Sequence, residues 1–61
     1  MDAFTINELI ACARRELGQR RRVYRRLVEA GKMDPADAKR EIALMEAIRD
    51  NLENQQTPKL F

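Results

Sequence analysis

A single break, between Gly31 and Pro35, divides this chain into two stretches with the apolar periodicity of α-helices. Glycine adopts positive φ at a helix end without steric cost, and Asp34 followed by proline is typical of a helix start. Because only three or four residues link the two stretches, the helices must be antiparallel neighbours. The break therefore predicts an all-α fold, an antiparallel two-helix hairpin.

The ends of the two helices follow from local signals. Thr5 and Glu8 form a Thr-x-x-Glu capping box, so we expect the first helix over about 6–30. The second helix should extend over about 35–54, since no helix-breaking residue follows within it. The remaining residues, 55–61, contain polar residues and a proline before an apolar Leu60-Phe61 end, and we predict that they form a flexible C-terminal tail.

The chain is short for a stable fold. Residues 1–61 make one small domain, and a chain of this size buries only about 60% of the surface that its unfolded form exposes. Small folds are usually stabilised by disulfides, a metal or a partner chain. With one cysteine, Cys12, and no histidine, an intrachain disulfide and an imidazole-based metal site are excluded. We therefore predict no metal and no cofactor, and we expect self-association.

Apolar residues at alternating spacings of three and four define the buried stripe of each helix. Leu17 and Tyr24 lie on the first stripe, and Met45 lies on the second. Four residues widen this core to one side, where a lone hairpin would leave them in water: Leu9, Val23, Leu44 and Ile48. A second hairpin packed there would make a four-helix bundle, so we predict a homodimer, with these seven residues in its core or at its dimer contact.

Seven of the nine arginines fall within thirteen residues, with Glu16 as the only acid among them. This segment carries a formal charge of +6, although the whole chain carries only +2. On a helical wheel, three of the arginines point away from the apolar stripe and form an outward row: Arg15, Arg22 and Arg26. Three more lie along one flank of the stripe and form a flank row: Arg14, Arg21 and Arg25. Arg20 lies on the other flank, within reach of Glu16 at i, i+4.

The two rows differ in how they can be neutralised. Antiparallel packing places Glu41 and Glu46 near the middle of the first helix, where acids of the second helix can reach the flank row. The outward row is hard to neutralise within one hairpin. Like charges at i, i+4 cost a few tenths of a kcal/mol each, so the segment indicates anions elsewhere in space. Three sources stay open: the second helix or a partner copy of the chain, an acidic surface of another protein, and nucleic acid or a nucleotide.

No pattern in the sequence indicates catalysis. Cys12 has no histidine to activate it, and nothing gathers carboxylates in a cleft. We therefore assign no catalytic residue, expect no enzymatic activity, and expect Cys12 to be a small packing residue at a dimer contact. No apolar run approaches the ~20 residues that span a membrane, and no signal peptide is visible, so we expect a cytoplasmic protein without a membrane partner.

Four segments resemble small helical proteins encoded by prophages and Mu-like phages. These segments are residues 13–17 (ARREL), 20–24 (RRRVY), 27–33 (LVEAGKM) and 42–48 (IALMEAI). A few two-helix phage proteins of similar size are homodimers that bind and disable a host regulator, including a quorum-sensing transcription activator. The resemblance implies a non-enzymatic interaction protein that inhibits a host protein in the host cytoplasm. Their positive charge makes both arginine rows candidate partner contacts. Binding of nucleic acid or a nucleotide through the first helix is the alternative.

Overall fold

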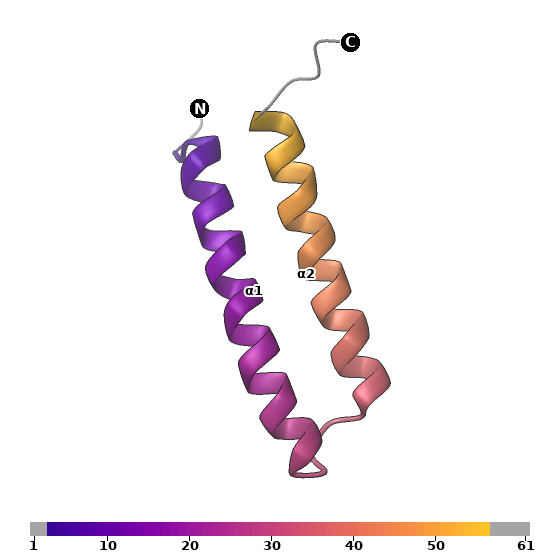
Figure 1. The fold of residues 1–61 in the computed structure, drawn as a ribbon. Helices are drawn as coiled ribbons and strands as arrows, with labels where there is room; N and C mark the ends of the chain where they lie inside the picture. The colour runs from indigo at the N-terminus through magenta and orange to yellow at the C-terminus, as the bar shows by residue number, and fades with distance from the viewer. Residues whose placement is uncertain (1–2, 57–61) are drawn as a thin grey trace.

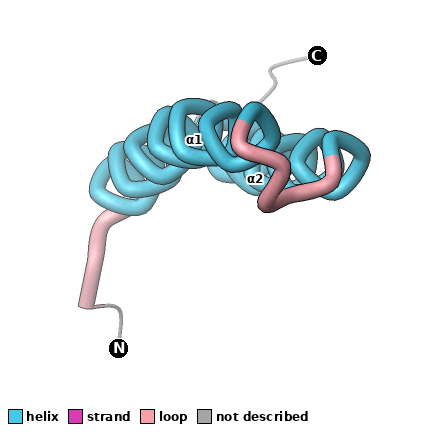
Figure 2. The backbone as a smooth tube through the Cα atoms, turned by 90° about the horizontal axis from the view of Figure 1, so that it is seen from below, coloured by secondary structure: helices cyan, strands magenta, loops and turns pink. Residues whose placement is uncertain are grey.

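The computed structural model describes residues 3–56, and its regular elements over that range are two helices. Helix α1 spans Ile6–Glu29 and helix α2 spans Pro35–Gln56. The two run antiparallel, side by side along their length, with the turn at one end (Figure 1). The all-α helical hairpin predicted from the sequence is confirmed. Seen from the turn end, the helices lie next to each other as a single layer (Figure 2).

The start of α1 is held by both halves of the predicted capping box. The backbone N–H of Glu8 donates to Thr5 Oγ1 at 3.1 Å, and the backbone N–H of Thr5 donates to Glu8 Oε1 at 2.9 Å. Two of the amide groups that a helix start leaves unpaired are thereby satisfied. The helix begins at Ile6, as the box predicts.

The turn is closed by a Schellman motif. Gly31 has φ 74°, and its N–H donates to the carbonyl of Val28 at 3.0 Å. The N–H of Lys32 donates to the carbonyl of Leu27 at 2.8 Å, which completes the motif. Asp34 then caps α2, because its Oδ1 accepts from the N–H of Ala36 at 2.7 Å.

Two boundaries differ slightly from the sequence-based expectation. The link contains residues 30–34, one or two more than predicted, because the capping residues at both ends stay outside the helices. Helix α2 continues through Gln56 instead of ending near residue 54. The side-chain amide of Gln56 donates to the side-chain oxygen of Asn7, which gives this last turn a contact on α1. The rest of the predicted tail, 57–61, lies outside the described residues.

The core is a single row of side chains between the helices. Its buried residues come from both helices: Ile10, Ala13, Leu17, Ala38 and Met45. Ile42 and Leu52 pack against this row, and Tyr24 is half-buried further along the stripe. Burial of Leu17 and Met45 is confirmed. The four residues predicted to widen the core remain between 42% and 48% exposed, so the hairpin alone does not bury them.

Candidate interaction surfaces

Ion pairs between the helices mark one broad side of the hairpin, here called the ion-paired face. Arg14 Nη2 lies 2.6 Å from Glu53 Oε2, and Arg21 Nη2 lies 2.7 Å from Glu46 Oε2. Both pairs join α1 to α2, so antiparallel packing does bring acids of α2 to the flank row. The seven-residue spacing of the arginines matches that of the glutamates, because two helical turns take about seven residues.

Arg25 is the exception in the flank row. Within residues 3–56 it makes no ion pair. Continuing the register of the two ion pairs by one turn places Arg25 opposite Ile42, which packs against the core. The flank row is therefore only partly neutralised, because α2 offers an apolar residue where a third acid would be needed.

Arg20 marks the opposite broad side of the hairpin. Its Nε donates to Glu16 Oε2 at 3.1 Å, as the i, i+4 spacing predicts. A terminal nitrogen donates to the backbone carbonyl of Glu41 at 3.0 Å and lies 3.5 Å from the Glu41 carboxylate. The hydrogen bond to Glu16 raises the pKa of Arg20 above its ordinary value, and the nearby Glu41 charge acts in the same direction. This arginine stays charged and is held across the two helices.

The exposed apolar residues share this second side. Leu9 lies within about 20° of Arg20 around the axis of α1, and Ile48 lies within about 20° of Glu41 around the axis of α2. Val23 lies on the same side of α1 as Leu9, and Leu44 lies on the same side of α2 as Ile48, each further from the line where the two helices meet. We call these four residues the apolar face: Leu9, Val23, Leu44 and Ile48. They are the residues that the sequence predicts at a dimer contact.

The outward row lies along the exposed side of α1. Arg15, Arg22 and Arg26 are all exposed, and over the part of the chain that the structure describes none of them makes an ion pair. Successive members are separated by about 10 Å and about 6 Å along the helix, at 1.5 Å per residue. The row is a linear array of guanidinium groups, each able to bind a carboxylate or phosphate through two hydrogen bonds.

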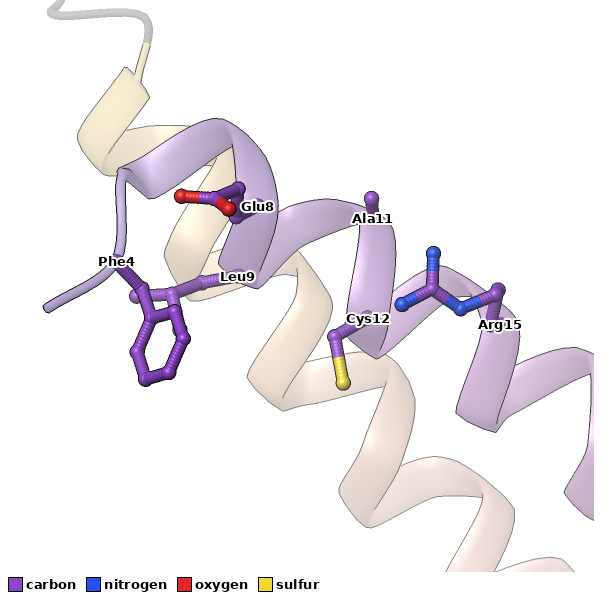
Figure 3. Close-up of a pocket in the computed structure, with 6 residues that line it drawn as sticks. All are labelled: Phe4, Glu8, Leu9, Ala11, Cys12 and Arg15. Atoms are coloured by element: carbon purple, nitrogen blue, oxygen red, sulfur yellow. The ribbon is translucent and has the colours of Figure 1, made fainter.

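A surface pocket of about 460 Å³ lies at the N-terminal end of α1 (Figure 3). Six residues line it: Phe4, Glu8, Leu9, Ala11, Cys12 and Arg15. The Phe4 ring and the Leu9 side chain lie beside each other, the Cys12 thiol points to the same side, and the guanidinium of Arg15 turns back toward Cys12 (Figure 3). Cys12 is exposed and forms no disulfide.

Phe4 is a site residue that the sequence analysis missed. It is the residue before the N-cap Thr5, and Leu9 is the fourth residue of the helix that follows. Apolar residues at these two positions form a hydrophobic staple, which fixes the angle at which the chain enters a helix. The staple pattern was therefore the signal that could have found it.

Among residues 3–56 no group of three or more His, Cys, Asp or Glu side chains gathers where it could hold a metal ion. Neither of the two described helices combines the length and the apolarity needed to cross a membrane. Comparison of the chain with protein-family models, curated proteins and solved structures finds no match. The apolar face, the outward row and the pocket are therefore the candidate interaction sites of the described residues.

Proposed function

We propose that this chain is a non-enzymatic interaction protein that dimerises through its apolar face and binds an acidic surface of another protein through its outward row. One observation carries the proposal. Within the arginine segment of α1, Arg14, Arg20 and Arg21 have ion-pair partners in the chain and Arg25 has none, whereas no member of the outward row has an ion pair within residues 3–56. Exposed positive charge in this ordered row is available to an outside anion.

The apolar face supports dimerisation. Its four residues keep nearly half of their surface in water, and the core beneath them is a single row. Burying the remainder of each side chain contributes roughly 1 kcal/mol, since full burial of such a residue contributes about 1.5–3 kcal/mol. Two hairpins joined at this face would form the four-helix bundle that the sequence predicts. The outward row would then lie on the outside of the bundle.

The outward row supports an acidic protein as the partner. Arginine is the residue best suited to hold carboxylates in a bidentate geometry, and three in line would match a line of acids. Binding would block whatever the acidic surface normally contacts, so inhibition would come from occlusion alone. The resemblance to small phage proteins favours a host protein, such as a transcription regulator, as the target, with the chain acting in the host cytoplasm.

Nucleic acid is the competing occupant of the outward row. Phosphates would suit the same guanidinium groups, but a binder of single strands also uses exposed aromatic rings for stacking. Tyr24, the aromatic residue of the arginine segment, is half-buried in the stripe between the helices. Helix α2 carries more acids than bases, which disfavours its approach to a phosphate backbone. These observations favour the protein partner.

A charge-reversal experiment tests the proposal. Wild type should bind a fluorescent peptide rich in Asp and Glu at ~50 mM salt, with an affinity that falls as salt rises. The triple variant Arg15→Glu/Arg22→Glu/Arg26→Glu should lose this binding. The matched control, Lys32→Glu/Lys39→Glu/Arg40→Glu, makes the same charge change at exposed positions of the turn and α2, and should retain most of it.

Two outcomes would contradict the proposal. Equal binding by the two triple variants would mean that net charge alone attracts the peptide. Tighter binding to duplex DNA than to the peptide, with a log–log salt slope of about 0.9 per phosphate contact, would favour the nucleic-acid alternative.

A further inference from the structure

The pocket at the N-terminal end of α1 joins an apolar surface to the outward row. Phe4, Leu9 and Cys12 supply the apolar part of its lining, and Arg15 belongs both to the pocket and to the outward row (Figure 3). Its volume of about 460 Å³ lies in the range of about 300–1,000 Å³ that is usual for ligand sites. A site of this composition suits a group with an apolar body and a negative charge close by.

Phe4 is held in place yet remains largely in water. The capping box fixes Thr5, and the staple sets the Phe4 ring beside Leu9. Even so, Phe4 is 64% exposed, the highest value among the large apolar residues that the structure describes. An aromatic side chain that is positioned by its backbone and open to solvent has little conformational entropy left to lose on binding. Residues of this kind dominate the energetics of protein interfaces.

The charge within the lining is positive. Glu8 is engaged by the capping box, where its carboxylate accepts from the backbone N–H of Thr5 at 2.9 Å and from the Thr5 hydroxyl at 3.2 Å. Arg15 has no such partner within residues 3–56. An incoming carboxylate would therefore find a guanidinium at the rim of the pocket, with the next one, Arg22, about 10 Å further along α1.

We infer that this pocket binds one apolar side chain of an acidic peptide segment, whose carboxylates then lie along the outward row. The inference rests on the proposed function and adds the chemistry of the partner. Because Arg15 joins the two sites, the apolar residue must lie next to an acid in space. A second acid would follow about 10 Å away, which is two turns of a helical partner or three residues of an extended one.

A second copy of the chain is a poorer occupant. Four of the lining residues, Glu8, Ala11, Cys12 and Arg15, lie on the side of α1 opposite its buried stripe, and the pocket shares only Leu9 with the apolar face. Two copies that meet over Leu44 and Ile48 would leave this side of α1 at the edge of the bundle. A second copy that filled the pocket with its own α1 would also bring its outward row toward Arg15, and like charges would oppose that contact.

Two labelled peptides test the inference on the full chain. Both carry the same Asp and Glu residues, and one has a single phenylalanine where the other has serine. We expect the phenylalanine peptide to bind wild type about tenfold more tightly, as one well-seated aromatic side chain would. Phe4→Ala should bring the two affinities together by weakening only the phenylalanine peptide.

Ala47→Ser is the matched control, because it changes an exposed apolar residue that lies outside both the pocket and the apolar face, and it should preserve the tenfold ratio. Equal binding of the two peptides to wild type would overturn the inference and leave the proposed function standing. No binding of either peptide would contradict the proposed function itself. A lower solution mass for Phe4→Ala by light scattering would show that a second copy fills the pocket, which also overturns the inference.

Discussion

The two broad sides of the hairpin differ in whether their exposed side chains find partners within the chain. On the ion-paired face, arginines of α1 meet glutamates of α2 with matching seven-residue spacing, so charge is neutralised within the chain. On the apolar face, Leu9, Val23, Leu44 and Ile48 share one side with Arg20, which is held across the helices, and remain between 42% and 48% exposed. The first side is paired within one hairpin except at Arg25, whereas the second gains further apolar burial only when something packs on it.

The largest expected effect comes from charging the apolar face. Leu44→Glu/Ile48→Glu should convert the proposed dimer to single chains and lower the thermal midpoint by about 10 °C or more, because carboxylates would have to be buried at the contact. Light scattering and a thermal melt followed by circular dichroism measure the two effects. Ala43→Glu/Ala47→Glu adds the same charge at exposed positions of α2 and should change neither by much. An unchanged mass for the first variant would remove the apolar face as the dimer contact.

A smaller effect is expected for the arginine within the apolar face. Arg20→Met keeps an unbranched apolar stem but leaves Glu16 and Glu41 without their shared cation, so we expect unfolding to become easier by about 1 kcal/mol. Because its pKa is raised, the stabilisation from Arg20 is present at neutral pH and is lost on the alkaline side only as strongly alkaline solution deprotonates the guanidinium. Urea titration measures the change, and a more stable variant would mean that this face prefers an all-apolar surface.

The smallest effect is expected on the ion-paired face. A double-mutant cycle on Arg21→Ala and Glu46→Ala should give a coupling of about 0.5 kcal/mol or less, since both side chains are substantially exposed. The coupling should shrink further at 1 M salt, where exposed charges are screened. A coupling above about 2 kcal/mol would contradict this, because exposed pairs rarely exceed 1 kcal/mol, and it would make the charges a main source of stability.

Local signals in the sequence predicted most of the fold. The helix ends can be recognised from residues only a few positions apart, Thr5 with Glu8 and Gly31 with Asp34. Helix caps satisfy backbone groups of the adjacent turn, so their signal is local. The pairing of Glu46 with the flank row also followed, since antiparallel packing and a short turn leave little choice of register. Phe4 was missed because helical periodicity identifies only residues within a helix, and Phe4 precedes the start of α1.

Two features, the lack of an ion pair at Arg25 and the pocket, depended on how separate segments of the chain pack against each other. The lack of a partner for Arg25 depends on which residue of α2 lies opposite it, and helix periodicity does not contain that information. The pocket likewise arises from how the segment before α1 turns against the first helical turns, which sets Phe4 beside Leu9 and Arg15 at the rim.

By itself the sequence determined the two helices, their caps and the separation of the arginines into rows, because these follow from backbone hydrogen bonding and helical periodicity along one chain. Only the tertiary structure decided that Arg25 has no ion pair within residues 3–56, that Arg20 is held across both helices, and where a pocket opens. Those outcomes depend on the relative register and rotation of α1 and α2, which side chains settle when they pack. The outward row keeps its charge available because it lies on the side of α1 that α2 cannot reach.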